Sequence, residues 1–179
     1  MKKVKMVCAG FGGQGVLSVG QLIAMMAMNK NLLVSWMPSY GPEMRGGTAN
    51  CHVVIDDSDI GSPIIADGIT HLLAMNEPAL KKFLPNVATG GVVVANASMI
   101  KDSSLRQDVQ WVLLDFYQIA TEAGNQRAQN MAALGALIKY IPEFSETDGL
   151  AIIEEKFGIK NAEMVSVNQK ALQLAYTQA

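Results

Sequence analysis

A run of six residues near the N-terminus has the composition of a turn that binds phosphate. The run is Gly10-Phe11-Gly12-Gly13-Gln14-Gly15, directly after an apolar stretch and directly before a segment with helical periodicity. Glycines allow a tight turn and close backbone approach, and a helix N-terminus offers free N–H groups and partial positive charge to an anion. We therefore expect a diphosphate or similar anion to bind at Gly10, Gly12, Gly13, Gln14 and Gly15.

A dinucleotide site requires one more residue, which this sequence lacks. In such sites an acidic side chain binds the ribose hydroxyls from the end of the second strand, about 20 residues beyond the turn. The second strand expected here ends in Trp36-Met37-Pro38, and the first acidic residue after the turn is Glu43. The pattern argues against NAD or FAD, although a stand-alone nucleotide-binding oxidoreductase stays open. A turn whose glycines serve only the packing of helix against strand stays open as well.

A second polar stretch, residues 40–47, gathers a phenol, a carboxylate and a guanidinium among glycines and a proline. An arginine followed by two glycines can present a pair of N–H groups to a phosphate or carboxylate. The alternative is a solvated loop whose exposed ion pair contributes little to stability. We include as further binding residues Tyr40, Glu43, Arg45, Gly46 and Gly47.

The elements that must position these two stretches alternate between strand and helix. Apolar, β-rich runs predict strands at 4–9, 32–37, 48–56, 71–75, 91–95 and 111–114. Helical spacing predicts helices at 16–29, 77–84, 116–123, 131–141, 145–157 and 163–176, and Ser145 to Asp148 resembles a capping box. We expect a single α/β, Rossmann-like domain with a mostly parallel sheet flanked by helices and a helical C-terminal part.

Composition excludes several functional classes. The 14 basic and 16 acidic residues give a net charge of −2, without the positive charge that nucleic-acid binding requires. No apolar stretch reaches the roughly 18 residues of a membrane helix, and glycines interrupt any signal-peptide core behind Lys2, Lys3 and Lys5. We therefore expect a cytoplasmic protein without nucleic-acid or membrane partners.

Cysteines and histidines are too few and too isolated for a metal site. Cys8 and Cys51 lie within apolar, strand-like runs and form no C-x-x-C pair, which predicts buried reduced thiols. His52 and His71 have no metal-ligand spacing and are expected to be structural. We predict no metal site and no catalytic residue on this chain.

Taken together, the two polar stretches resemble the gamma subunit of 2-oxoacid:ferredoxin oxidoreductases. The similarity is greatest to gamma subunits of the 2-oxoglutarate and branched-chain 2-ketoacid enzymes. It rests on Gly10–Gly15 and Ser39–Cys51, with further similarity at Gly124-Asn125, Asn130-Met131, Leu134-Gly135-Ala136 and Asn168. The resemblance covers nearly the whole chain and implies one gamma-type domain over residues 1–179.

The resemblance implies a role within a larger enzyme. Such enzymes cleave a 2-oxoacid with thiamine diphosphate, pass electrons through iron–sulfur clusters to ferredoxin, and release acyl-CoA and carbon dioxide. The thiamine site lies on alpha and beta subunits, and the clusters lie on other chains or domains, with a ferredoxin-like subunit or ferredoxin as a partner. In agreement, Ala66 stands where a thiamine-type G-D-G signature has its first glycine, and two cysteines cannot hold a cluster.

The resemblance implies that this chain contributes to subunit assembly and binds coenzyme A. It also implies that the chain itself holds no tightly bound cofactor. A purely structural adaptor and a homodimer of the isolated chain stay open. Half of the residues are hydrophobic and 11 are methionine, so we expect part of this apolar surplus on partner-facing surface. The alternative is a dense core with nearly all Met and Leu buried.

Overall fold

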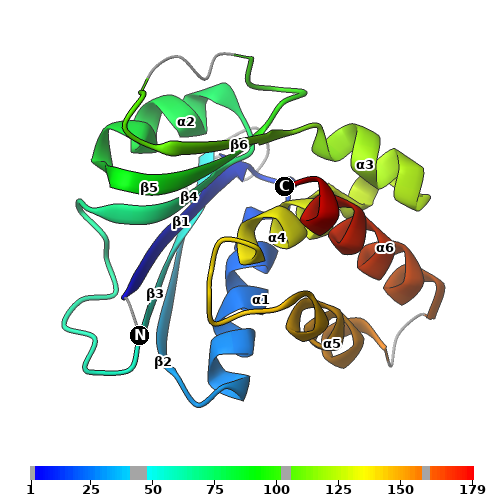
Figure 1. Cartoon of the computed structure of the whole chain (residues 1–179), viewed down its shortest axis with the longest axis horizontal. Coiled ribbons are helices and arrows are strands. Elements are labelled where there is room, and N and C mark those ends of the chain that lie inside the picture. The colour runs from blue at the N-terminus through cyan, green and yellow to red at the C-terminus, as the bar shows by residue number, and fades with distance from the viewer. Residues whose placement is uncertain (1–2, 41–47, 102–105, 159–161) are drawn as a thin grey trace.

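One six-stranded sheet organises the described part of the chain, residues 3–40, 48–101, 106–158 and 162–179 of a computed structural model (Figure 1). Its strands are β1 (Val4–Phe11), β2 (Leu33–Tyr40), β3 (Thr48–Asp56), β4 (Ile69–Ala74), β5 (Val87–Asn96) and β6 (Gln110–Leu114). The helices are α1 (Val16–Asn29), α2 (Glu77–Phe83), α3 (Phe116–Ala123), α4 (Gln129–Ile138), α5 (Glu146–Phe157) and α6 (Ala162–Gln178). Two short 3-10 turns, η1 (Leu84–Asn86) and η2 (Gln126–Ala128), follow α2 and precede α4.

The strands lie in the order β2-β3-β1-β4-β5-β6. β1, β4, β5 and β6 pair in parallel, whereas β3 is antiparallel to both of its neighbours, β1 and β2. Every described strand except β3 therefore runs in one direction, which confirms the α/β architecture with a mostly parallel sheet. The expected chain order of strand, turn, helix and strand is present, but β3 separates β1 from β2 in space.

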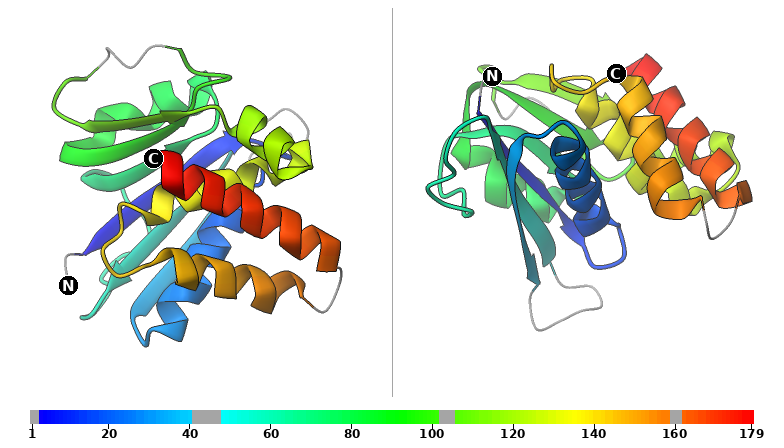
Figure 2. Two further views of the ribbon diagram at one scale, coloured as in Figure 1. Left: turned by 45° about the vertical axis from the view of Figure 1, so that its right-hand side comes forward. Right: turned by 90° about the horizontal axis from the view of Figure 1, so that it is seen from below.

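Helices cover both faces of the sheet, with α2 on one face and α1 and α3–α6 on the other (Figures 1 and 2). Alternate side chains of β1 enter the two cores: Met6 and Cys8 pack on the α1 side, and Val7 and Ala9 on the α2 side. A strand covered on both faces needs apolar residues at consecutive positions. This explains why the sequence shows β1 as a nearly continuous apolar run instead of an alternating one.

Most element boundaries agree with the periodicity of the sequence. α1 ends at Asn29 as expected, and Ser145 caps α5, since Asp148 N donates to Ser145 Oγ at 3.2 Å. β4 and β5 begin earlier than expected, and α4 ends at Ile138 rather than Ile141. The early part of β5 contains Ala88 and the pair Gly90-Gly91, residue types that are depleted in strands, so the sequence alone did not indicate this part of the strand.

The apolar surplus is divided between the core and the surface. Among the described residues, Met28, Met37, Met99 and Met164 are exposed, so the composition does not reflect a dense core alone. Within the same residues, no helix combines the length and apolarity needed to cross a membrane.

The helical C-terminal part depends on close contact between α4 and α6. Gly135 of α4 lies directly against the main chain of Leu172 in α6, where an added Cβ would overlap the carbonyl oxygen of Leu172. All residues of α4 from Met131 to Ile138 are buried, so the helix has little room to move away.

We predict that Gly135→Ala destabilises the fold by about 1–3 kcal/mol, because overlap with main-chain atoms outweighs the roughly 1 kcal/mol by which alanine favours a helix. Urea unfolding monitored by circular dichroism measures the change. Gly61→Ala is the control, since an added Cβ at Gly61 meets no atom within 4 Å. Equal unfolding midpoints for the two variants would contradict this account of helix packing.

Candidate functional site

The candidate site lies where the chain leaves β1 and β4 in opposite directions. After β1 the chain continues into α1 on one face of the sheet, and after β4 it continues into α2 on the other face (Figure 1). Because neighbouring parallel strands diverge in this way, a crevice opens outside their carboxyl ends, and ligands of open α/β sheets bind at such points.

The glycine turn forms one wall of this crevice. Gly13 and Gly15 have left-handed backbone conformations, with φ of 97° and 75°. Gly15 is the N-cap of α1 and supplies no side-chain cap, and the first turn of α1 has no acidic residue. A Cβ at Gly15 would lie 2.6 Å from Asn130 Nδ2, whereas a Cβ at Gly13 would meet nothing within 4 Å. The turn therefore packs tightly at Gly15 and remains open at Gly13.

The side chain of Gln14 joins the ends of β1 and β4. Its Oε1 accepts hydrogen bonds from Phe11 N at 2.7 Å and Asn76 Nδ2 at 3.0 Å, and its Nε2 donates to Met75 O at 3.3 Å. Asn76 in turn caps α2, because its Oδ1 accepts from Ala79 N at 2.9 Å. Gln14 thus fixes the turn relative to the start of α2 and uses its amide inside the protein.

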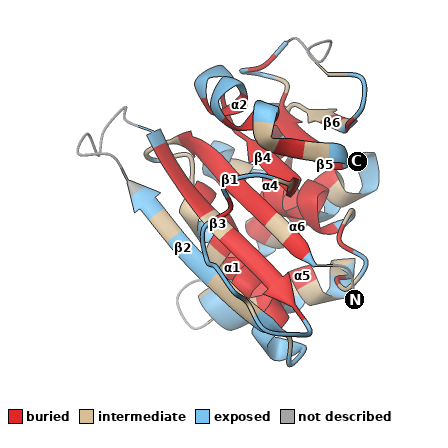
Figure 3. Ribbon diagram, turned by 90° about the vertical axis from the view of Figure 1, so that its left-hand side faces the viewer, coloured by how far each residue is buried: buried red, intermediate tan, exposed pale blue. Residues whose placement is uncertain are grey.

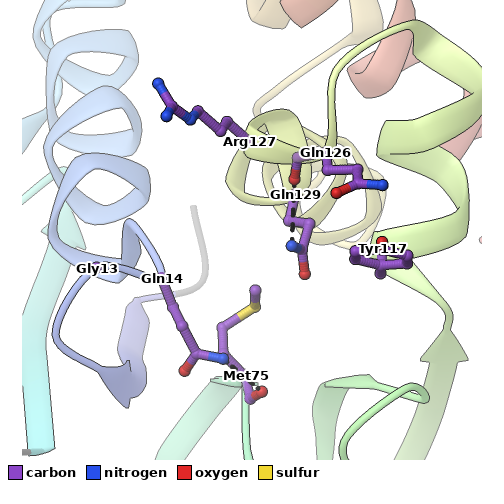
Figure 4. Close-up of a pocket in the computed structure, with 7 residues that line it drawn as sticks. All are labelled: Gly13, Gln14, Met75, Tyr117, Gln126, Arg127 and Gln129. Carbon is purple, nitrogen blue, oxygen red and sulfur yellow. Dashed lines mark hydrogen bonds between the residues drawn. The ribbon is translucent and has the colours of Figure 1, made fainter. Parts of the chain in front are cut away.

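A cleft of about 440 Å³ opens between this turn and the corner formed by α3, η2 and α4 (Figure 4). Figure 4 shows Arg127 extending from η2 in the direction of α1, with Gln126 and Gln129 beside it. The cleft is lined by Gly13, Gln14, Met75, Tyr117, Gln126, Arg127 and Gln129.

Arg127 supplies the cation in the described lining of this cleft, although the sequence motifs did not indicate it as a site residue. Among the described residues its guanidinium forms no hydrogen bond or ion pair, although its backbone N donates to Asn125 Oδ1 at 3.0 Å. A signal was available, because Gly124, with φ of 114°, ends α3 and Asn125 starts a polar run that contains one arginine. The spacing alone could not show that this run faces the glycine turn.

Arg127 also borders a second cleft, of about 460 Å³. Its polar lining includes Ser18 in the first turn of α1 and the largely buried Asn168 of α6, and its apolar lining includes Phe157 and Val167. Arg127 therefore contributes to two clefts, each of which is lined by both polar and apolar residues.

Tyr40, at the start of the second polar stretch, and Thr48, directly after it, lie at the same edge of the sheet as the glycine turn. Tyr40 ends β2 and is paired with Ala49, and Thr48 begins β3 paired with Phe11, directly before the glycine turn. Glu43, Arg45, Gly46 and Gly47 lie outside the described residues. Gly10, expected in the turn, belongs to β1, and an added Cβ there would lie 2.7 Å from Gln14 Oε1.

The thiols and imidazoles lie away from the cleft. Cys8 and Cys51 are direct partners across β1 and β3 and are both buried, and the hydrogen bond between them raises the pKa of Cys8 and lowers that of Cys51. Burial lowers the pKa of both His52 and His71. Within the described ranges, side chains of His, Cys, Asp and Glu do not gather in groups of three. The cleft itself presents glycine, amide, guanidinium, thioether and phenol groups.

Comparison with known proteins gives both a family and relatives. The family model described as pyruvate ferredoxin/flavodoxin oxidoreductase matches residues 5–178. Ketoisovalerate oxidoreductase subunit VorA from Methanothermobacter marburgensis is 40% identical over 137 residues, which cover 76% of this chain and 28% of VorA. The match therefore spans less than one third of that relative.

Two solved structures share the fold. The gamma subunit of keto/oxoacid ferredoxin oxidoreductase from Geobacter sulfurreducens has a TM-score of 0.83 at 24% identity, covering 98% of both chains. The 2-oxoglutarate:ferredoxin oxidoreductase from Magnetococcus marinus, with 2-oxoglutarate, coenzyme A and succinyl-CoA bound, has a TM-score of 0.89 at 25% identity. It is matched over 100% of this chain and 31% of its own.

We predict that Gln14→Ala lowers the free energy of unfolding by about 1–3 kcal/mol, because Phe11 N, Asn76 Nδ2 and Met75 O each lose a partner. Thermal and urea unfolding of the full chain measure the loss. Gln118→Ala on the exposed side of α3 is the control. If both variants unfold like the unmodified chain, the Gln14 amide does not hold the strand ends together.

Proposed function

Since the chain belongs to the pyruvate ferredoxin/flavodoxin oxidoreductase family, we propose that it is the gamma-type subunit of a 2-oxoacid:ferredoxin oxidoreductase. In this proposal residues 1–179 form a single gamma-type domain. The complex converts 2-oxoacid, CoA and oxidised ferredoxin into acyl-CoA, carbon dioxide and reduced ferredoxin. Thiamine diphosphate and iron–sulfur clusters reside on alpha, beta and ferredoxin-like partners, and the location is cytoplasmic.

The chain's own task in this proposal is to bind coenzyme A. The observation that carries it is the position of the Arg127 guanidinium, which has no partner among the described residues, across the cleft from the open glycine turn and the N-terminus of α1, which has no side-chain cap. Coenzyme A carries a diphosphate and a further phosphate, and such anions are bound by arginine and by helix N-termini. The Magnetococcus marinus structure, which contains coenzyme A, supports the assignment.

The groups in the cleft favour binding over catalysis. Within the described residues that line it, no carboxylate, imidazole or thiol is available as a nucleophile or a general base. Gly13 and Arg127 would hold phosphate oxygens, and Gln14 would keep the turn in place through its bonds to Phe11 and Asn76. We infer a 2-oxoacid as the substrate class, because the similar proteins are named for two different 2-oxoacids.

Subunit contact is the second part of the proposal. Strand β2 is an edge of the sheet, without a charged residue from Leu33 to Tyr40, and Figure 3 shows it largely exposed or half-buried. Among its exposed residues, Leu33 and Met37 lie on one face of the strand and Trp36 on the other, toward α1. We call these residues, together with Met28 at the end of α1, the β2 surface. Exposed apolar groups on an uncharged edge strand are typical of protein interfaces. We assign this surface to the alpha and beta subunits.

We predict that Arg127→Ala weakens coenzyme A binding to the reconstituted complex by about tenfold to a hundredfold, the usual range for a lost charge-assisted hydrogen bond. Isothermal titration calorimetry measures the affinity, and the apparent CoA requirement of turnover gives a second readout. Lys81→Ala on α2, across the sheet, is the control for net charge. NAD is expected to give no binding heat.

Arg45→Ala is tested in the same assays, and a raised CoA requirement in an intact complex is expected. Unchanged turnover together with unchanged CoA affinity would remove Arg45 from the site. The same result for Arg127→Ala would contradict the CoA assignment. Loss of co-purification at normal CoA affinity would favour the structural adaptor, and binding of NAD would favour the stand-alone enzyme.

We predict that Met37→Lys reduces co-purification with the alpha and beta subunits by about tenfold or more, because it places a charge within a desolvated contact. Met37 is 42% exposed, so the variant chain should unfold like the unmodified one. Met99→Lys, at a similarly exposed position after β5, is the control. Equal recovery of complex with both variants would argue against the β2 surface as the subunit contact.

A further inference from the structure

A separate cavity of about 520 Å³ lies at the amino ends of β1, β4 and β5, at the opposite edge of the sheet from the glycine turn. The segment between α4 and α5 closes it from one side. Apolar walls come from Val4, Val92 and Pro142, and polar groups come from Lys3, Thr70, His71, Thr89 and Glu143.

Both ring nitrogens of His71, which lines this cavity, lie within hydrogen-bond distance of a partner. His71 is 8% exposed, with Nε2 at 3.0 Å from Tyr140 O and Nδ1 at 2.9 Å from Thr70 Oγ1. A carbonyl oxygen only accepts, so Nε2 carries the proton. Burial lowers the pKa of His71, which leaves the ring neutral at pH 7. His71 therefore brings no positive charge to its neighbour Glu143.

One oxygen of the Glu143 carboxylate has no hydrogen-bond partner among the described residues. This oxygen, Oε2, is buried, although the residue as a whole is half-buried. Lys3, a cation that also lines the cavity, is paired with Asp56 at 2.9 Å and holds the pKa of that carboxyl well below its usual range. A buried acceptor without a donor is costly, and a charged one more so. Among the described residues, the cavity thus combines a carboxylate oxygen that lacks a donor with apolar walls.

We propose that this cavity binds a primary ammonium group carried on a short aliphatic chain, with Glu143 as its counter-ion. A metal ion requires several oxygen ligands, whereas an ammonium group needs one carboxylate and its chain needs apolar surface. Val4, Val92 and Pro142 supply that surface. The ammonium belongs either to a free amine or to a lysine side chain of a partner subunit, and both present the same chemistry to Glu143.

Titration of the ¹⁵N-labelled full chain with butylammonium, followed by NMR, tests the proposal. Butylammonium is expected to shift the amide resonances of Thr70, Gly91 and Val92, and the isosteric neutral 1-butanol is expected to leave them unchanged. Glu143→Gln keeps the shape and removes the charge, so it should weaken binding at least about tenfold. Glu122→Gln, an exposed acidic position on α3, should bind like the unmodified chain.

Equal shifts of these amide resonances with 1-butanol and with butylammonium would overturn the proposal. The absence of shifts with both compounds would overturn it as well, and neither result requires a variant protein. Undiminished binding of butylammonium to a folded Glu143→Gln would overturn the role of the carboxylate. Nα-acetyl-lysine amide distinguishes the two sources. Shifts as large as those from butylammonium identify a lysine side chain as the ligand, and shifts from butylammonium alone identify a free amine.

Discussion

The side-chain amide of Gln14 holds together the two strand ends between which the cleft opens. Its three hydrogen bonds join the end of β1, the end of β4 and the cap of α2, although β1 and β4 lead into helices on opposite faces of the sheet. Without a bond across this divergence, the turn and the start of α2 would be connected only through the sheet. The bonds of Gln14 therefore add a direct link between the glycine turn and the start of α2.

The groups of this cleft are suited to binding a ligand and not to reacting with it. The polar capacity of Gln14 is used within the protein, while the open backbone at Gly13 and the guanidinium of Arg127 remain available to an anion. Groups of this kind stabilise negative charge and fix its position, and the described residues that line the cleft include no carboxylate or imidazole to act as an acid–base pair. This composition fits the binding role proposed above.

The sequence predicted the helices, the sheet and the glycine turn because each has a local signal. Helical spacing, apolar runs and Gly-rich turns depend on residues close together in the chain. The capping box at Ser145 and Asp148, for example, was predicted from four consecutive residues and is present in the structure. The position of β3 between β1 and β2, and the approach of Arg127 to residues more than 100 positions earlier, depend on packing between distant segments. The unpartnered oxygen of Glu143 likewise follows from burial, which spacing does not encode.

The place of β1 at the centre of the sheet has a consequence for how the chain folds. β1 precedes the other strands of the sheet in the sequence, yet its neighbours are β3, with Met6 opposite Val53, and β4, with Met6 opposite His71. Both pairings close long loops, and long loop closures slow folding. One edge of β1 can pair only after β3, at residues 48–56, has been synthesised, and the other edge only after β4, at residues 69–74. Until β3 follows, the apolar side chains of β1 have no sheet partner and remain open to contacts with other molecules.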